Sequence, residues 1–400
     1  MVAAGEGGPG GLGDGETQAR ALTRALAELE HELLTPALVI DLDAVEHNID
    51  RIVGHVGKLR RWRPHIKTVK QSRVVRLLLE RGVDSLKCAT VDELALVLDT
   101  AERVHPEGQV DVFLAYPLTR NALRATISLA RDYEGGRIRL LADSPEHLRA
   151  LTDWLGSTRC PRPFEVLLDV DLGMQRTGST AAAWRDVTEQ LGAARQLRIV
   201  GLHGYEGHLG WADREQAHAA YDELVALASA LGSVELVVTS GSHAFDHALA
   251  HEGLRSGSWL HQVSPGTIVL SDCRSAEPAA ALGLRQAVFV ATRVVSRSAT
   301  DRITVDAGSK ALAPDRPAPS CTVLGRPHLE GLEASEEHRP FVVRDGERPA
   351  LGELLWLVPD HACTTVNLHR RVLYVRGESL VGKGTVEAMS RTIEVGARRP

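Results

Sequence analysis

Residues 63–70 read Arg-Pro-His-Ile-Lys-Thr-Val-Lys. A short apolar segment precedes this stretch, and a helical pattern over 72–81 follows it. Strand, polar turn and helix in that order are the usual setting of an active-site residue at the carboxyl end of a barrel strand. Pro64 favours extended backbone at Arg63, so we expect Lys67 at the strand end, facing a pocket.

Lys67 admits two interpretations. A lysine amine in such a pocket, once free of its proton, can attack a carbonyl group and form a Schiff base. The simpler interpretation is a solvated basic loop, because Arg60, Arg61, Arg63 and Lys70 lie close by in the sequence. The rest of the chain favours the first interpretation.

Strand-like and helical segments alternate from residue 37 to about 271. The expected strands are 37–41, 62–66, 84–89, 110–115, 138–142, 164–170, 198–204, 235–239 and 267–270. The expected helices between them are 43–57, 72–81, 91–101, 119–131, 145–155, 181–195 and 213–231. Repeated strand–helix units predict a parallel sheet, and roughly eight of them match a closed (β/α)8 TIM-type barrel. The alternative, a doubly wound open sheet, is disfavoured because no Gly-x-Gly-x-x-Gly follows the first strand.

The pattern changes after about residue 280. Segments 286–296, 301–306, 341–344, 353–358, 371–376 and 385–395 are β-like, which predicts a second, mostly antiparallel β domain. We therefore expect a disordered glycine-rich leader over 1–16, a helix over 17–33, a barrel domain over 17–275 and a β domain over 276–400. The first strand, 37–41, is a candidate member of the β domain.

Composition excludes several classes of protein. The 400 residues are 44% hydrophobic and carry a net charge of −6, so nothing indicates binding of nucleic acid or of an anionic membrane. No apolar run is long enough to cross a membrane, and no signal peptide is evident. Five scattered cysteines predict no disulfide framework and a cytoplasmic location.

Two polar turns lie at the ends of expected strands. Arg176 lies in the Gly-flanked loop 169–178. An arginine at such a place can bind an anion or a cofactor oxygen. A single arginine in a loop is equally compatible with an exposed surface position. Tyr205 lies in the turn 201–208 together with His203 and His208, which are possible acid–base groups. A tyrosine there either lies near a ligand or packs in the barrel mouth with its hydroxyl bonded to the backbone.

Two further turns are candidate phosphate sites. One contains Ser240, Gly241 and Ser242, and the other contains Gly266 and Thr267. Backbone N–H groups and hydroxyls of such turns can hold phosphate, and loops after late barrel strands often do so.

His361 and Cys363 form a candidate metal site. In an extended segment, residues two apart point to the same side, and imidazole with thiolate suits zinc. A buried cysteine beside a structural histidine is the other interpretation.

Together these motifs resemble the D-threonine aldolase/D-serine dehydratase family, which has pyridoxal-phosphate enzymes of the alanine-racemase-like fold. The resemblance rests on Thr35–Asp43, on residues 63–70, and on the loops around Arg176 and Tyr205. It covers about 35–376 and departs from the family at Val69, at Ser242-His243 and at the C-terminus.

The resemblance implies a role for each candidate residue. Lys67 would hold pyridoxal 5'-phosphate, with Arg176 and Tyr205 near its ring and the two small-residue turns at its phosphate. His361 and Cys363 would hold a divalent metal, with zinc favoured and manganese as the alternative. Asp306 and Asp315, otherwise simple turn formers, fall in a motif of the aldolase form. The family also implies a homodimer with its active site near the subunit interface.

The implied activity is a lyase reaction on a β-hydroxy-D-amino acid. The motif around Asp306 and the residue Asn367 favours retro-aldol cleavage to glycine and an aldehyde, whereas Cys363 favours β-elimination to a 2-keto acid and ammonia. We place the aldolase first. A racemase is disfavoured because Tyr374 is the sole tyrosine after Tyr221, and a non-catalytic cofactor-binding protein would lack the metal pair and the second domain.

Overall fold

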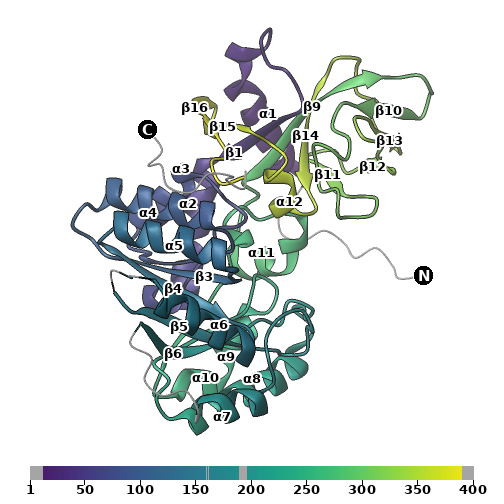
Figure 1. Ribbon diagram of the computed structural model, residues 1–400. Helices are drawn as coiled ribbons and strands as arrows, with labels where there is room; N and C mark the ends of the chain where they lie inside the picture. The colour runs from purple at the N-terminus through teal and green to yellow at the C-terminus, as the bar shows by residue number, and fades with distance from the viewer. Residues whose placement is uncertain (1–11, 159, 161, 189–195, 390–400) are drawn as a thin grey trace. The chain divides into compact units, whose positions relative to one another are not determined.

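The computed structural model describes residues 12–158, 160, 162–188 and 196–389 (Figure 1). Its contacts divide the chain into two compact units. The barrel unit comprises Val53–Lys67 and Val75–Gly266, and the sheet unit comprises the chain up to Ile52 with Thr68–Val74 and Thr267–Met389. Among the described residues, no helix is both long and apolar enough to cross a membrane.

The barrel unit contains a parallel sheet in sequential strand order. Its strands are β2 (Ser85–Cys88), β3 (Val110–Pro117), β4 (Gly136–Ala142), β5 (Phe164–Val170), β6 (Leu197–Gly204), β7 (Leu236–Thr239) and β8 (Leu260–Val263). Nearly all are buried on both faces, as parallel strands covered by helices are. The expected strands from 84–89 to 235–239 are confirmed.

Residues 62–66 complete the ring. They form no regular strand, because Pro64 cannot donate to a ladder. Two isolated parallel bridges, Trp62–Val263 and His65–Lys87, join them to β8 and to β2. The segment thus occupies the eighth position and closes the sheet into a TIM-like barrel.

The prediction of a last barrel strand over 267–270 was wrong. Residues 267–270 form a 3-10 turn, Thr267–Val269, in which the Thr267 carbonyl accepts hydrogen bonds from the N–H groups of Leu270 and Ser271. The strand is instead β8, whose sequence Leu-His-Gln-Val is half polar and therefore gave a weak pattern.

Helices pack against the strands that they connect: α4 against β2 and β3, α6 against β4, and α8 against β6 (Figure 1). The helices are α2 (Leu42–Val56), α3 (Ser72–Glu80), α4 (Val91–Val104), α5 (Arg120–Asp132), α6 (Pro145–Gly156), α7 (Ala181–Thr188), α8 (Arg214–Leu231), α9 (Phe245–Ala250), α10 (Glu252–Ser256) and α11 (Ala276–Leu282). All seven expected helices are present; the end of the pattern expected over 181–195 lies outside the described residues. The short helices α9, α10 and α11 were not expected.

A chain of ion pairs follows the amino ends of the barrel strands. Arg63 and Arg139 both bind Asp111, at 2.9 and 2.8 Å. Arg139 also binds Glu165 at 2.5 Å, and Arg198 binds Glu165 in turn. These charges tie the closing segment 62–66 to β3, β4, β5 and β6 at the end opposite the candidate site.

The sheet unit is built on a nine-stranded sheet in the order β12-β13-β10-β9-β1-β15-β16, with β14 on β9 and β11 on β14. Its strands are β1 (Ala37–Asp41), β9 (Val288–Ser296), β10 (Arg302–Val305), β11 (Cys321–Val323), β12 (Leu329–Gly331), β13 (Arg339–Val343), β14 (Leu354–Pro359), β15 (Arg371–Arg376) and β16 (Ser379–Thr385). All pairs are antiparallel except β1 with β15. β1 therefore belongs to this sheet, the alternative left open for 37–41.

Helix α1 (Leu12–Ala25) is followed by the 3-10 turn Ala27–Leu29. Leu22 and Leu26 pack against Phe289 and Trp356 of the sheet. Helical structure therefore begins at Leu12, within the segment expected to be disordered, because its apolar face is covered; residues 1–11 lie outside the described residues. Of the expected strand 385–395, Thr385 is the last residue of β16, and residues 386–389 form no strand; residues 390–395 lie outside the described residues.

Candidate active site

Lys67 directly follows the segment that closes the barrel. Its backbone N–H donates to His65 Nδ1 at 3.3 Å, and its Nζ lies 5.9 Å from the centroid of the Tyr205 ring. Within the described part of the chain, this amine makes no hydrogen bond or ion pair. The expected placement at a barrel strand end is therefore observed.

Arg176 and Tyr205 lie together. The Arg176 guanidinium carbon is 5.1 Å from the Tyr205 ring centroid. The loop carrying Arg176 is closed by a bridge between Val170 and Ser179 and by Asp171, which accepts from the N–H groups of Gly173 and Gln175. Like Lys67, Arg176 has no counter-ion among the described residues. Two basic side chains without polar partners among the described residues thus face one aromatic ring, an arrangement suited to an anionic, planar ligand.

Two glycines make room for the Tyr205 ring. A Cβ at Gly207 would lie 2.3 Å from the ring, and a Cβ at Gly241 would lie 3.0 Å from it. The Tyr205 hydroxyl has no hydrogen bond in the described part of the chain, so the predicted backbone partner is not observed. His208 of the same turn is exposed.

His203, the other histidine of this turn, is buried. Its Nδ1 lies 2.6 Å from Asp169 Oδ1, and its Nε2 lies 2.7 Å from Lys87 Nζ. Burial and the nearby Lys87 lower the pKa of His203 despite Asp169, so the ring is neutral: Nδ1–H donates to the carboxylate and Nε2 accepts from Lys87. Neither Lys87 nor Asp169 was singled out from the sequence. For Lys87, the signal available in the sequence was a charged residue inside the expected strand 84–89.

The first candidate phosphate turn is strained and buried. Ser240 adopts φ +65°, which is uncommon for a residue with a side chain. Its hydroxyl lies 3.1 Å from that of Tyr221 and is thus already engaged. Gly241 packs on Tyr205, and Ser242 is buried without a side-chain hydrogen bond among the described residues.

The second candidate turn contains a free donor. The Ser264 hydroxyl is buried and has no hydrogen-bond partner in the described chain, which is rare for a buried polar group. Gly266 lies against the backbone of His65, where a Cβ would approach the carbonyl oxygen to 2.0 Å. An orphaned hydroxyl beside a glycine that allows close backbone approach fits a phosphate oxygen.

Thr267, predicted for the cofactor, and Cys363, predicted for the metal, meet within the sheet unit. Thr68 Oγ1 lies 3.1 Å from Thr267 Oγ1 and 3.0 Å from Cys363 Sγ. Thr267 Oγ1 lies 3.4 Å from the same sulfur. In the chain, Thr68 is the residue after Lys67.

The metal motif is not the extended segment that its prediction assumed. His361 is extended, but Ala362–Val366 form the short helix α12, because Asp272 accepts from the Ala362 N–H at 2.8 Å and the Thr365 hydroxyl bonds the His361 carbonyl. The His361 and Cys363 side chains still interact. Their hydrogen bond is the main cause that raises the pKa of His361 to about 9.

Asp315 orients His361. One carboxylate oxygen lies 2.6 Å from His361 Nδ1, and the other accepts from the Thr364 hydroxyl at 2.7 Å. A carboxylate on one ring nitrogen leaves the other for a metal, the usual outer-shell arrangement. No group of three or more potential metal-binding side chains occurs in the described part of the chain. His361 and Cys363 would thus supply two protein ligands, and a metal held there would take its remaining ligands from water or substrate.

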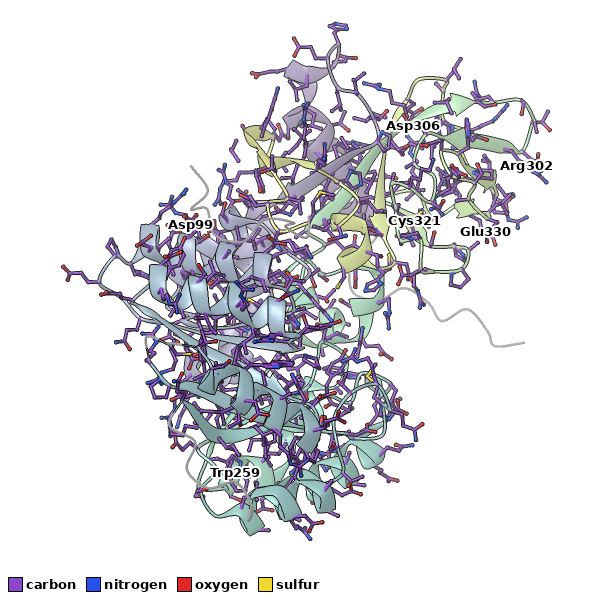
Figure 2. The ribbon with its side chains drawn as sticks, viewed as in Figure 1. Asp99, Trp259, Arg302, Asp306, Cys321 and Glu330 are labelled. Atoms are coloured by element: carbon purple, nitrogen blue, oxygen red, sulfur yellow. The ribbon has the colours of Figure 1, made fainter. Side chains whose placement is uncertain are left out.

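Asp306 has a structural position instead. The side chain of Asp306 is labelled in Figure 2. It accepts hydrogen bonds from Thr292, at 2.5 Å, from Thr35, and from the Arg293 N–H. These contacts tie the start of β1 to β9 and β10. The Asp306 carboxylate is therefore engaged in hydrogen bonds with the protein itself. It joins separate segments, whereas the sequence suggested only a turn-forming residue.

Comparison with known proteins covers both parts of the chain. The model of the alanine racemase N-terminal domain matches residues 40–270, and the model of a serine dehydratase domain matches residues 287–375. A D-threonine aldolase from Arthrobacter sp is 26% identical over 358 residues, covering 86% of this chain and 89% of its own. A D-threo-3-hydroxyaspartate dehydratase from Delftia sp. is 27% identical over 365 residues, covering 83% and 91%.

Solved structures agree with the fold. The D-threonine aldolase from Filomicrobium marinum superposes with a TM-score of 0.75 at 25% identity, covering 89% of this chain and 96% of its own. A variant of the D-threo-3-hydroxyaspartate dehydratase in a metal-free form gives a TM-score of 0.65 at 23% identity, covering 88% and 97%. The resemblance inferred from the sequence is thereby confirmed.

Proposed function

Because the chain belongs to the family with an alanine racemase N-terminal domain, we propose that it is a pyridoxal-phosphate-dependent lyase that acts on a β-hydroxy-D-amino acid. The observation that carries the proposal is the unpaired Lys67 amine over the Tyr205 ring, with Arg176 beside it. Relatives that match along most of the chain are an aldolase and a dehydratase for such substrates.

Each residue near Lys67 has a role in this proposal. When bound, pyridoxal phosphate supplies an electron sink for the charge that develops at Cα. Lys67 would hold the cofactor covalently, and Tyr205 would stack on its ring. Arg176 would offer its guanidinium to an anionic oxygen. The turns with Ser240, Gly241 and Ser242 and with Gly266 and Thr267 would hold the phosphate.

His65 would position Lys67. Burial and the neighbouring Lys67 and Lys87 hold the pKa of His65 well below its usual range, so the ring is neutral at physiological pH. Its Nδ1 can then accept the Lys67 backbone N–H, which fixes the start of the lysine side chain.

His361 and Cys363 would hold a divalent metal, and Asp315 would orient His361. Imidazole and thiolate together favour zinc over manganese. A bound metal supplies Lewis-acid polarisation of a substrate oxygen. The metal-free form of the related dehydratase supports a metal in this family.

Retro-aldol cleavage to glycine and an aldehyde is the first candidate reaction, supported by the two D-threonine aldolases among the similar proteins. The second candidate is β-elimination to a 2-keto acid and ammonia, favoured by the thiol of Cys363. A racemase is less consistent with the geometry, because the Tyr374 hydroxyl is buried and donates to Gln71 at 2.9 Å.

Product analysis distinguishes these reactions. The purified protein with pyridoxal phosphate and zinc or manganese would be given D-threonine, D-phenylserine and D-serine. Glycine with an aldehyde supports the aldolase, ammonia with a keto acid supports the dehydratase, and neither product from any substrate contradicts the proposal.

The role of Lys67 has its own test. Lys67→Ala is expected to abolish the visible absorbance of lysine-bound pyridoxal phosphate, whereas Lys58→Ala, which removes an exposed lysine, is expected to keep it. A band that survives Lys67→Ala means that another lysine holds the cofactor. The proposal also includes a cytoplasmic location and a homodimer; light scattering of the purified protein would test the homodimer.

A further inference from the structure

Lys87 is a buried amine at the centre of the barrel that the proposed function leaves without a role. It lies on β2, whereas its partner His203 lies on β6, across the barrel. Asp169 on the neighbouring strand β5 lies 2.6 Å from the other nitrogen of the same ring, and the Thr177 hydroxyl donates to Asp169 at 2.8 Å. All three side chains of the Lys87–His203–Asp169 chain are buried.

The hydrogen-bonded group Lys87–His203–Asp169 reaches the proposed cofactor pocket. Lys87 Nζ lies 5.8 Å from the Tyr205 ring centroid, and Lys67 Nζ lies 5.9 Å from the same centroid. Two amines therefore face one ring. Lys67 is a loop residue without a polar partner for its amine among the described residues, whereas Lys87 is held in place by His203.

The surroundings of Lys87 make proton exchange easy. Phe113 on β3 contributes an apolar ring at 5.9 Å. The charged or titratable groups that face the amine are Lys67 and His65 of the closing segment, Asp169 on β5, Arg176 of the following loop, His203 on β6, and Glu206 after it. Burial and Lys67 lower the pKa of Lys87 to about 7, although Asp169 and Glu206 oppose that change. An amine near neutrality both takes up and releases protons at physiological pH.

Glu206 does not neutralise this amine as a fixed carboxylate. It is buried, and neither of its side-chain oxygens has a hydrogen bond of good geometry within the described residues. Burial raises the pKa of Glu206, which favours the neutral acid. The anion that supports Lys87 is therefore Asp169, and it acts through His203.

We propose that Lys87, held by His203 and Asp169, is the second proton-transfer group of the lyase site beside Lys67. The inference rests on the proposed function and names the base that acts on the substrate in addition to the cofactor lysine. His203 and Asp169 are positioning residues: they direct the Lys87 lone pair and N–H groups and stabilise the ammonium once it forms.

The step balances without any further reactant. In retro-aldol cleavage the β-hydroxyl proton passes to the neutral Lys87 nitrogen, and the O–H electron pair becomes the second bond of the aldehyde C=O. The Cα–Cβ bond breaks, and its electron pair remains with the Cα fragment. The Lys87 ammonium then returns the proton to Cα, which gives glycine and restores the amine.

Three variants test this role by kinetics. Lys87→Met keeps the stem and is expected to lower kcat by at least about 100-fold, the ordinary contribution of general acid–base catalysis. Lys87→Arg keeps a positive charge, but its guanidinium does not give up a proton in proteins. This variant is therefore expected to lower kcat as much as Lys87→Met does. Lys58→Met is the matched control on an exposed lysine. Normal turnover by Lys87→Arg would show that only charge is needed and would overturn the proposal.

The pH profile and chemical rescue separate proton transfer from structure. Wild-type kcat is expected to fall below about pH 7 as Lys87 becomes protonated, and this acidic limb should disappear in Lys87→Met. Added methylamine should restore turnover to Lys87→Ala in proportion to its concentration. An unchanged acidic limb, or no rescue, counts against Lys87 as the base.

A spectroscopic test does not depend on activity. The chain has six lysines, so NMR of the full-length protein with 13C-labelled lysine should show one side chain that titrates near pH 7. That signal should vanish in Lys87→Met, remain in Lys58→Met, and move in His203→Gln. If every lysine titrates above about pH 9, the inference is wrong even if the protein is a lyase. If the titration is found but no lyase product forms, the proposed function and the catalytic role of Lys87 are both wrong.

Discussion

Asp111 is expected to be the most sensitive position of the ion-pair chain at the amino end of the barrel. Its carboxylate accepts from Arg63 Nη1 at 2.9 Å and from Arg139 Nε and Nη2 at 2.9 and 2.8 Å. The Arg63 side chain is only 1% exposed and that of Arg139 is 9% exposed. Asp111→Asn would leave both guanidinium groups buried with one carboxylate fewer.

The size of the effect follows from the pKa of Asp111. Burial raises this pKa, but the two arginines outweigh it and lower the pKa to about 2, from an ordinary value of 3.8. That difference corresponds to about 2 kcal/mol of folding free energy. Arg139 keeps its ion pair with Glu165, but Arg63 is left buried without a carboxylate partner, which adds to the loss. We therefore expect Asp111→Asn to lower the free energy of unfolding by about 3 kcal/mol at pH 7.

The contribution of Asp111 to stability depends on pH in a definite direction. Because the folded pKa of Asp111 lies below the unfolded one, its contribution is complete above about pH 4 and is lost as the pH falls toward 2. About half should remain at pH 3. The difference between wild type and Asp111→Asn should therefore narrow between pH 4 and pH 2.

Urea unfolding followed by tryptophan fluorescence measures this difference, since Trp62 and Trp184 are buried in the same unit. The control is Asp99→Asn on α4 (Figure 2), whose pair with Arg103 is exposed and should contribute no more than about 0.5 kcal/mol. A loss below about 1 kcal/mol for Asp111→Asn, or one that is equal at pH 3 and pH 7, would refute the reasoning.

Three further predictions concern the candidate site. Gly207→Ala places a Cβ 2.3 Å from the Tyr205 ring and should weaken pyridoxal phosphate binding at least about 10-fold by displacing that ring; an unchanged absorbance titration would contradict this. Ser264→Ala removes a buried hydroxyl without a partner, so thermal unfolding without cofactor should show equal or slightly higher stability, while affinity for pyridoxal phosphate falls; a protein less stable by more than about 1 kcal/mol would mean that the hydroxyl has a structural partner. Asp315→Asn should lower metal affinity about 10- to 100-fold, measured by competition with a chelating dye, and unchanged affinity would show that Asp315 does not support His361.

Local patterns were sufficient for most elements of the fold. The strands β3 to β7 are mainly apolar runs bounded by turns, and their helices carry one apolar face, so each can be recognised within its own segment. Two of the four residues are polar both in β2, which was expected, and in β8, which was missed. His261 on it is nevertheless buried and hydrogen-bonded to Thr239 at 2.8 Å, a partner that the local sequence does not show.

The candidate site was predictable only where a single loop carries the chemistry. Lys67, Arg176 and Tyr205 each lie at a strand end that the pattern predicts, and parallel strands bring such ends to one edge. The expected extended geometry at 361–363 was wrong because Asp272, about ninety residues earlier, accepts the Ala362 N–H and starts a helical turn. A contact at that distance along the chain has no local signature.

By itself the sequence determined the strand–helix order, the family and the lysine that is expected to hold a cofactor, because periodicity and short motifs are properties of adjacent residues. Only the tertiary structure placed Lys87 against His203. These residues lie on β2 and β6, 116 positions apart, and they meet because the segment 62–66 closes the sheet and turns the two strands toward each other across the barrel. The sequence shows that a lysine and a histidine exist, but closure of the ring makes them a hydrogen-bonded pair.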